Sequence, residues 1–254
     1  MHPVFFSIGP IQIRFYGLMY VVAIVVGYFL LKSEVKRKKM GLTPDDVMNL
    51  IFWVVLGGVV GARIYYVVFN WEFYQMDWKE IPAVWHGGLA IHGGILGGLL
   101  GGYTYTRRKG LSFFRAADAV APSLILGQAF GRVGNFMNGD AHGLPTTMPW
   151  GMVFPPGSIA GDQFPNMPLH PTMLYEMVIN LAVFFFLWTI RKKPAKDGFI
   201  ICLYLILYSM GRFVVSFFRA DSLMLGEYRA AVLMSIVIVA VLTPVLIAKK
   251  FWRR

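Results

Sequence analysis

The chain has 254 residues, of which 57% are hydrophobic and only 15% are charged, and its formal net charge is +11. A soluble protein of this length needs more charged residues to cover its surface, so the composition indicates a polytopic membrane protein. The positive residues gather at the ends of apolar runs, as in membrane anchoring, which argues against nucleic acid as a partner. The single cysteine, Cys202, excludes an internal disulfide, and no removable signal peptide is expected at the N-terminus.

Seven apolar runs each approach the length of about 20 residues that a helix needs to cross the hydrocarbon core of a bilayer. In chain order they cover residues 11–31, 47–69, 89–105, 116–136, 172–190, 199–218 and 228–248. The sequence therefore predicts an all-α polytopic membrane protein with seven transmembrane helices, which form a single transmembrane domain over residues 1–254.

The positions of lysine and arginine indicate how the chain is oriented across the membrane. Ten of the eleven lysines fall in four basic clusters, which follow the first, third, fifth and seventh runs at residues 32–39, 107–115, 191–196 and 249–254. The loops after the second, fourth and sixth runs are poor in both residue types. Because cytoplasmic loops carry the excess of Lys and Arg, we expect the N-terminus outside and the C-terminus in the cytoplasm.

The loop between the fourth and fifth predicted helices, residues 137–171, holds seven of the fourteen prolines and no lysine or arginine. Flexible linkers favour Gly and Ser, whereas this loop combines proline with Trp150, Phe154 and Phe164. We therefore expect a small ordered extracytoplasmic (periplasmic) cap. The alternative is a loop that is merely exposed.

Glycine recurs at four-residue spacing in two of the runs. Gly93, Gly97 and Gly101 lie in the third run, and Gly57 and Gly61 lie in the second. Small residues at this spacing let helix backbones approach closely, so packing is the expected role of these glycines.

With that orientation, six helices place polar side chains in the outer half of the bilayer. A charge at the bilayer centre costs about 3 kcal/mol on insertion scales, so charged residues there need a structural or functional reason. The residues concerned are Tyr16, Arg63, His92, Arg132, Asn135, Tyr175, Glu176, Arg212 and Arg219. Asp118, near the inner end of the fourth helix, is the exception.

Arginine is the side chain whose planar fork matches a phosphate. Arg212 and Arg219 are seven residues apart, which places them on one helical face about 10 Å apart along the axis, with Ser216 between them. Arg132 and Asn135 share a face of the fourth helix. Arginines that converge in this way would form an anion site in a low dielectric, where charge-assisted bonds to phosphate are strong.

Most of the arginines also have a structural alternative. Arg63 can pair with an acid such as Glu176. Arg132 is harder to explain structurally, because it lies in GRVGNFMNGD (131–140), where glycines flank the charge and two asparagines follow. The arginines that can instead extend to the membrane interface as snorkelling side chains are Arg14, Arg219 and Arg229.

His92, in HGGLAIHGG (86–94), is a candidate general base, since an unperturbed pKa of about 6.5 suits proton transfer at neutral pH. It is alternatively a histidine held in a structural hydrogen bond. His86 does not share its helical face, and no cluster has metal-ligand spacing, so neither a metal nor another cofactor is expected. His170, in HPTMLYE (170–176), is either a hinge or a site residue.

Six strings of residues are spread in order along nearly the whole chain. They are SIGPIQIRFYGLMY (7–20), GARIYYVVF (61–69), HGGLAIHGG, GRVGNFMNGDAHG (131–143), HPTMLYE and GRFVVSFFRAD (211–221). Together they resemble the bacterial prolipoprotein diacylglyceryl transferase family. That family moves the diacylglyceryl group of phosphatidylglycerol to the lipobox cysteine thiol of a prolipoprotein signal peptide and releases glycerol phosphate. The resemblance implies a multi-pass transferase of the bacterial cytoplasmic (inner) membrane that acts in lipoprotein biosynthesis.

The resemblance also implies roles for individual residues. Arg132 would contact the lipid phosphate and take part in catalysis with Arg212 and His92. The residues expected to bind substrate are Tyr16, Arg132, Asn135, Asn138, Asp140, Arg212 and Arg219. The residues expected around them are Arg63, His170, Tyr175, Glu176 and Ser216. Because the nucleophile is the thiol of the substrate, such an enzyme needs no catalytic Ser or Cys of its own.

Two residues depart from the family's pattern. Asp140 stands where the family usually has Glu, a shorter side chain that is still acidic. Ser216 stands where the family commonly has Glu, which would leave Arg212 and Arg219 less neutralised. His92, or a nearby acceptor, is expected to help deprotonate the incoming thiol, either as the base or as a positioning donor.

Two other classes of protein remain as alternatives. A lipid or anion transporter also needs arginines in a membrane cavity, but it predicts access from both sides, whereas the polar groups here concentrate in the outer half. A seven-helix receptor with a retinal Schiff base needs a lysine inside a late span, and the last run has none before Lys249. Neither class accounts for the six strings.

Overall fold

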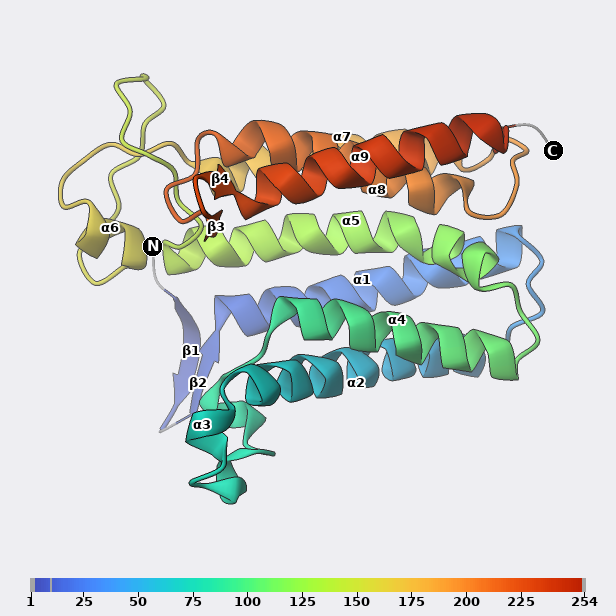
Figure 1. Ribbon diagram of the computed structural model, residues 1–254, viewed down its shortest axis with the longest axis horizontal. Helices are drawn as coiled ribbons and strands as arrows, with labels where there is room; N and C mark the ends of the chain where they lie inside the picture. Colours follow the sequence, from blue (N-terminus) through green and yellow to red (C-terminus); the bar gives the residue numbers. More distant parts are fainter. Residues whose placement is uncertain (1–2, 10, 253–254) are drawn as a thin grey trace. The chain divides into compact units, whose positions relative to one another are not determined.

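Helices make up most of the structure, a computed structural model that describes residues 3–9 and 11–252 (Figure 1). The long helices in these ranges are α1 (Phe15–Arg37), α2 (Pro44–Phe69), α4 (Ile91–Arg108), α5 (Phe113–Asn138), α7 (Thr172–Ile190), α8 (Phe199–Ser216) and α9 (Ala230–Ala248). Each overlaps one of the seven predicted runs. Arg253 and Arg254, which belong to the fourth basic cluster, lie outside the described residues.

The shorter elements lie near the ends of the long helices. They are the helices α3 (Trp71–Tyr74) and α6 (Ile159–Gln163), the 3₁₀ turns η1 (Trp78–Glu80) and η2 (Val84–His86), and the strands β1 (Val4–Ile8), β2 (Ile11–Arg14), β3 (Met224–Leu225) and β4 (Tyr228–Arg229).

Within the described part of the chain, five helices are long and apolar enough to cross a membrane: α1, α2, α7, α8 and α9. The helices α4 and α5 have 18 and 26 residues, but glycines, arginines and other polar residues make them less apolar. The structure is thus mostly helical with five candidate spans, which is consistent with an all-α membrane protein.

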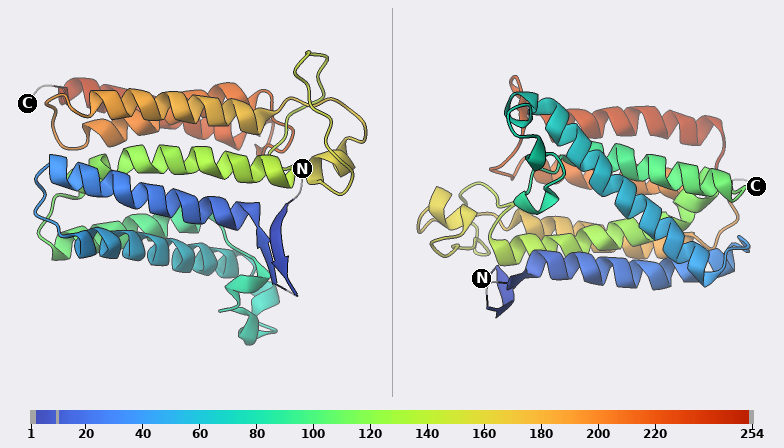
Figure 2. Two further views of the ribbon diagram at one scale, coloured as in Figure 1. Left: turned by 180° about the vertical axis from the view of Figure 1, so that it is seen from behind. Right: turned by 90° about the horizontal axis from the view of Figure 1, so that it is seen from below.

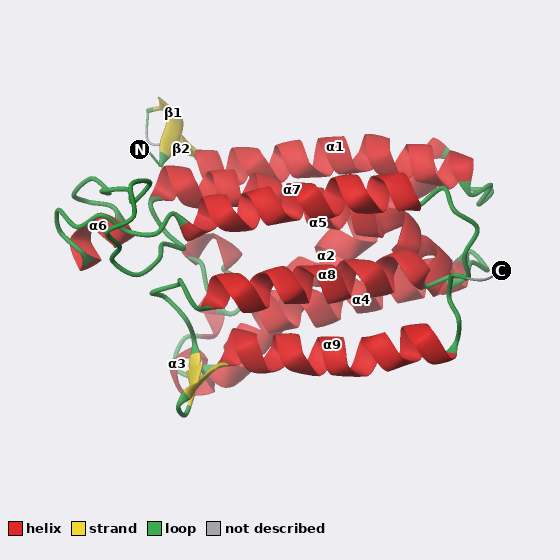
Figure 3. Ribbon diagram, turned by 90° about the horizontal axis from the view of Figure 1, so that it is seen from above, coloured by secondary structure: helices red, strands yellow, loops and turns green. Residues whose placement is uncertain are grey.

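Two short antiparallel hairpins correct the predicted starts of the first and last runs. The first predicted run begins at Ile11, but Ile11–Arg14 is strand β2, paired with β1, and α1 begins only at Phe15. Alternation of Ile13 with Gln12 and Arg14 suits a strand rather than a helix. The last run likewise begins with strand β4, and Figure 3 shows the β3–β4 hairpin at the start of α9.

The chain divides into two compact units, one formed by residues up to Leu30 and from Ala117 on, the other by Leu31–Ala116. In the second unit α2 packs against α4 (Figures 1 and 2). A methyl group added to Gly61 would lie 2.9 Å from the Gly97 Cα atom, and one added to Gly97 would meet the Gly57 carbonyl group. The expectation that these glycines serve close packing is therefore confirmed.

Helix α2 begins with a capping box. The Thr43 hydroxyl accepts a hydrogen bond from the Asp46 backbone N–H at 3.1 Å, and the Asp46 carboxylate accepts one from the Thr43 N–H at 3.0 Å. Pro44, whose fixed φ suits the first helical position, follows the cap. These residues satisfy donors that the start of a helix leaves free.

In the first unit, α5, α7 and α8 share a hydrophobic core. Ile125 of α5 and Leu187 of α7 are fully buried in it, and Ile200 of α8 is nearly so. Asp118, the polar residue that stood apart in the sequence, accepts hydrogen bonds from the Gly198 and Ile201 N–H groups at 3.0 Å each. Asp118 therefore caps the N-terminus of α8, where a negative charge is favoured.

Residues 137–171 form a packed segment that shares a small core with the start of α7. Phe154, Ala160, Leu169 and Met173 are buried together, and isolated β-bridges join Leu169 to Pro145 and Met152. Helix α6 lies in this segment (Figure 1), and the Ser158 hydroxyl caps it by accepting from the Gly161 N–H at 3.0 Å. The packed segment leads directly into α7.

Candidate functional site

Glu176, one turn into α7, is the centre of a buried charge cluster in the first unit. One of its carboxylate oxygens, Oε1, accepts hydrogen bonds from Arg212 Nη1 at 2.5 Å and from Arg219 Nη1 at 2.8 Å. The other, Oε2, forms an ion pair with Arg132 Nη2 without hydrogen-bond geometry. The Glu176 side chain is only 4% exposed. Three arginines that are far apart in the sequence thus meet on one carboxylate.

Arg132, near the end of α5, is oriented by its own helix. Its Nη1 atom donates to Asn135 Oδ1 at 2.9 Å, and Asn135 Nδ2 donates to Asp140 Oδ1 at 2.6 Å. The Arg132 Nε atom is buried and has no hydrogen-bond partner among the described residues. Arg132 therefore retains a donor that a bound acceptor would satisfy.

Arg219 also pairs with a second carboxylate. Its Nε and Nη2 atoms donate to the two oxygens of Asp221, at 2.8 Å and 2.6 Å. Burial alone would lower the pKa of Arg219, but the hydrogen bond to Asp221 and the charges of Glu176 and Asp221 raise it. The guanidinium group therefore stays charged.

The position of Arg219 differs from the expected one. Helix α8 ends at Ser216, so Arg219 does not continue the helical face of Arg212. It is held instead by a β-bridge to Gly143. A methyl group on Gly143 would lie 2.5 Å from the His170 Cβ atom and 2.7 Å from the Phe218 carbonyl oxygen, so only glycine fits there.

The charges of the cluster do not balance. Three guanidinium groups face the carboxylates of Glu176 and Asp221, so the direct ion pairs leave one positive charge. Among the contacts of the described residues, Asp140 is linked to the cluster through Asn135 and not by a direct ion pair. A buried excess charge is costly unless it is paired, so this arrangement favours a singly charged anionic ligand.

Tyr16, at the start of α1, lies against the same part of α5. A methyl group on Gly134 would be 2.7 Å from Tyr16 Cδ2, so the ring packs on the helix between Arg132 and Asn135. The Tyr16 hydroxyl is 3.4 Å from that of Tyr20. Tyr16 thus packs against the stretch of α5 that holds Arg132 and Asn135.

Other polar groups of the first unit bond to one another or have no partner. Tyr175 receives a hydrogen bond from Trp150 Nε1 at 2.7 Å, and its hydroxyl is 3.0 Å from His170 Nδ1. Asn138 Oδ1, on α5, is buried without a partner in the described chain. His142 is fully buried, and its Nε2 atom lies 3.0 Å from Gln163 Oε1.

His92 and Arg63 belong to the second unit. The His92 ring lies 6.0 Å from that of Tyr65, near the start of α4. Arg63, on α2, donates hydrogen bonds to four carbonyl groups and stacks on Tyr74. The carbonyl groups belong to Glu80, Ile81, Gly87 and Gly88.

Two interpretations from the sequence are corrected by these contacts. Arg63 bonds to main-chain carbonyls, where the sequence suggested an acid such as Glu176 as its partner. Arg219 is held in ion pairs and does not snorkel, since its side chain is only 8% exposed. Ser216 brings no charge to the cluster, so the counter-charges of Arg212 and Arg219 are those of Glu176 and Asp221.

The sequence did not single out two partners that complete this region. Asp221 lies only two residues after Arg219, a spacing that allows the bidentate pair and offers a local signal. Trp150 lies 25 residues before Tyr175, and no local spacing links the two. Ser216, which is fully buried, donates to the Arg212 carbonyl at 2.6 Å.

A cluster of arginines that share one carboxylate thus lies near the ends of long helices, in a chain whose apolar helices are consistent with a membrane protein. Residues 3–248 match the family described as prolipoprotein diacylglyceryl transferase. The chain is 43% identical to the phosphatidylglycerol–prolipoprotein diacylglyceryl transferase of Fusobacterium nucleatum, over 95% of this chain and 96% of that protein. Proteins of the same name from Acaryochloris marina (43%, covering 92% and 86%) and Staphylococcus haemolyticus (41%, covering 98% and 88%) are similar. The chain belongs to the prolipoprotein diacylglyceryl transferase family.

Proposed function

We propose that this protein transfers the diacylglyceryl group of phosphatidylglycerol to the thiol of the lipobox cysteine of prolipoproteins, releasing glycerol phosphate. It is a transferase of the first step of lipoprotein maturation, and the family match and the names of its relatives support this activity. The structural observation that carries the proposal is the arginine cluster on Glu176. Its single excess positive charge complements the single negative charge of a phosphodiester headgroup.

The reaction forms one bond and breaks one. The cysteine sulfur attacks the glyceryl carbon of the diacylglyceryl group, and the bond from that carbon to the phosphate oxygen breaks. The oxygen keeps the electron pair and leaves as glycerol phosphate, while the thiol proton passes to a base. Negative charge therefore grows on the phosphate, where preorganised donors have their largest effect.

The arginines are assigned to that growing charge. Arg132 and Arg212 would bind the phosphate oxygens, and the unpartnered Nε of Arg132 is a donor that the phosphate would satisfy. Asn135 and Asp140 orient Arg132. Tyr16, packed on Gly134, would close one side of the headgroup site.

The membrane arrangement belongs to the same proposal. All seven long helices would cross the bacterial cytoplasmic membrane, with the N-terminus outside and the C-terminus inside. Residues 137–171 would form an extracytoplasmic cap beside the charge cluster, and the backbone contacts Leu144 N–H to Phe218 O at 2.8 Å and Ala220 N–H to His142 O at 3.2 Å support this. The lipid would then reach the site from the outer leaflet.

Incubating the purified protein with phosphatidylglycerol and a lipobox peptide tests the activity. We expect the peptide mass to rise by one diacylglyceryl group in place of the thiol hydrogen, with release of glycerol phosphate. A peptide with Ser in place of the lipobox Cys is the matched control and should stay unmodified. Counterflow of lipid between liposomes with no covalent product would contradict the proposal and favour a transporter.

His92 is proposed as the acceptor of the thiol proton or as a donor that positions it. The pH–rate profile of His92→Gln separates the two roles. If His92 is the base, the acidic limb of the profile should disappear, since that limb reports protonation of the base. A His92→Gln enzyme that is slower but keeps the same acidic limb assigns His92 to positioning.

A further inference from the structure

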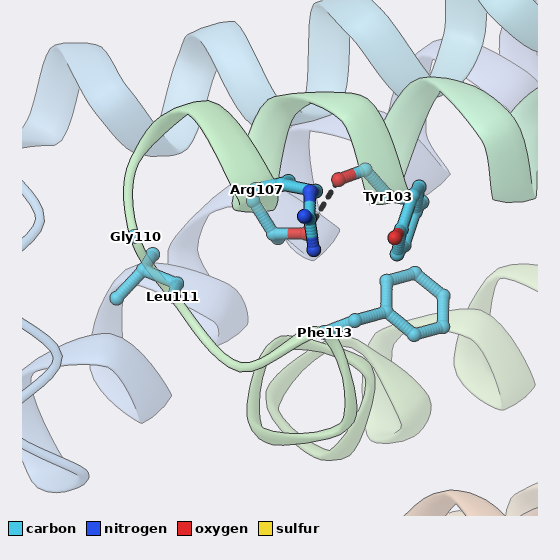
Figure 4. A pocket seen from close by; sticks show the side chains of 6 residues that line it. Tyr103, Arg107, Gly110, Leu111 and Phe113 are labelled. Carbon is cyan, nitrogen blue, oxygen red and sulfur yellow. Dashed lines mark hydrogen bonds between the residues drawn. The ribbon is translucent and has the colours of Figure 1, made fainter.

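A cavity of about 420 Å³ opens at the turn between α4 and α5, within the second unit (Figure 4). Small-molecule sites typically measure about 300–1,000 Å³, so its size suits a ligand. Figure 4 shows Arg107 between the rings of Tyr103 and Phe113 on one side and the turn at Gly110 and Leu111 on the other. Thr106 completes the lining.

Arg107 differs from the three cations that surround it in the basic cluster. Each of the other three has a protein partner: Arg108 lies 6.0 Å over the Trp53 ring, Lys109 Nζ is 2.6 Å from Asp46, and Arg115 donates to the Lys38 carbonyl at 2.5 Å. The side chain of Arg107 makes no hydrogen bond or ion pair within the described ranges, and it is exposed to the cavity. Arg107 is thus the cation of this cluster that lines the cavity and has free donors there.

The remaining walls fit an anion with an organic part. Tyr103 and Phe113 pack edge to face with their ring centroids 5.9 Å apart and form an apolar side. The Thr106 hydroxyl donates to the Gly102 and Tyr103 carbonyls, so it does not occupy Arg107. Phe113 is also the first residue of α5, and the start of a helix favours negative charge.

We propose that this cavity binds a phosphate group, with Arg107 as its main ligand. The guanidinium fork matches phosphate, and basic pockets on the cytoplasmic side of membrane proteins bind anionic lipid headgroups. The phosphate is carried either by an anionic lipid or by a free phosphate ion. The site is separate from the charge cluster, because Phe113 begins α5 whereas Arg132 lies in its last two turns. It does not depend on the proposed transferase activity.

Arginine footprinting on the full-length protein tests this proposal. Phenylglyoxal modifies free guanidinium groups, and peptide mass mapping gives a separate rate for each arginine. The protein is held in dodecyl maltoside, which carries no phosphate, and the probes are dioctanoyl phosphatidic acid and inorganic phosphate. At a probe concentration of ten times Kd, the rate at Arg107 should fall about tenfold. Arg108, which stacks on Trp53, is the internal control and should keep its rate.

The outcomes show whether the site exists and, if it does, whether its phosphate belongs to a lipid or is a free ion. Protection by phosphatidic acid but not by the same concentration of inorganic phosphate assigns the site to a lipid headgroup, and equal protection by both assigns it to free phosphate. Equal protection of Arg107 and Arg108, or no protection of Arg107, overturns the proposal.

A cavity-filling variant provides the second measurement. Leu111→Trp occupies the cavity and leaves every charge in place. It should abolish protection of Arg107 by either probe, while the melting temperature, which reports folding, stays close to the wild-type value. Undiminished protection of Arg107 in this folded variant also overturns the proposal.

Discussion

Buried arginine is used in two different ways in the two units of this protein. Arg63 in the second unit donates to four main-chain carbonyls and stacks on Tyr74, and it has no carboxylate among its hydrogen-bond partners. In the first unit, Arg132, Arg212 and Arg219 share Glu176. The donors of Arg63 are nearly saturated by the fold, whereas those of Arg132 are not.

The difference indicates what each arginine does. A guanidinium group has five N–H donors. When main-chain carbonyls accept from most of them, the arginine fixes the loop that supplies the carbonyls and has few donors left for a ligand. A cluster with one excess positive charge and an unpartnered Nε keeps capacity for an anion. We therefore expect substitutions at Arg63 to lower stability, and substitutions at Arg132 to lower the rate of the reaction.

Removing the shared carboxylate should have the largest effect. In Glu176→Gln three guanidinium groups lose their common counter-charge in a buried site, and breaking a buried pair typically costs about 3–5 kcal/mol. The free energy of unfolding, measured by denaturant titration in detergent, should fall by that amount, and activity should fall with it. Glu72→Gln, at an exposed position of α3, is the matched control. Wild-type stability in Glu176→Gln would contradict the central place given to this residue.

Arg132→Gln should mainly affect catalysis. Loss of one preorganised donor to the phosphate typically lowers the rate about 10²–10³-fold. Stability should change little, because Glu176 keeps Arg212 and Arg219 as partners. The kcat of peptide lipidation and the melting temperature together check this. The control is Arg14→Gln, since Arg14 is exposed on β2. Near-normal transfer by Arg132→Gln would show that Arg132 has no part in the mechanism.

Arg63→Gln should show the opposite pattern. The substitution leaves carbonyl groups of the segment between α2 and α4 without donors, and each such group costs about 1–3 kcal/mol, part of which the Gln amide recovers. We expect a net loss of stability of about 2–3 kcal/mol and a rate per folded molecule within about tenfold of wild type. A variant of wild-type stability with the activity loss expected of Arg132→Gln would show that Arg63 acts in the reaction and not in the fold.

Ser216→Ala should have the smallest effect. The hydroxyl donates only to the Arg212 carbonyl of its own helix, and one such hydrogen bond contributes about 1 kcal/mol. Unfolding free energy and lipidation rate should both stay close to those of the wild type. A rate as low as that expected of Arg132→Gln would show that Ser216 acts on substrate.

The long helices could be predicted because apolar runs and their basic flanks are local features of the sequence. The run at 172–190 coincides with α7 to the residue. The β1–β2 hairpin escaped prediction because Ile11 and Ile13 extend an apolar run, although their alternation with polar residues suits a strand. Local hydrophobicity alone does not distinguish the end of a strand from the start of a helix.

The arginines of the candidate site were easier to predict from the sequence than the carboxylate that they share. Arg132, Arg212 and Arg219 stand out because buried charge is rare, but the carboxylate they share lies 36 to 44 residues away in the sequence. No periodicity links Glu176 to them, and the same sequence allowed Glu176 to pair with Arg63. Asp118 is similar, since its capping of α8 joins it to Gly198. Contacts between helices of this kind are set by packing and leave no local pattern.

The arginine cluster is proposed to hold the phosphate of the lipid headgroup. Solid-state NMR of protein labelled with ¹⁵N in the arginine side chains, loaded with phosphatidylglycerol, measures this contact through the dipolar coupling between guanidinium nitrogen and phosphorus. We expect a coupling in the wild type that weakens in Arg132→Gln and persists in Arg14→Gln. An unchanged coupling in Arg132→Gln, or none in the wild type, would overturn this assignment of the cluster.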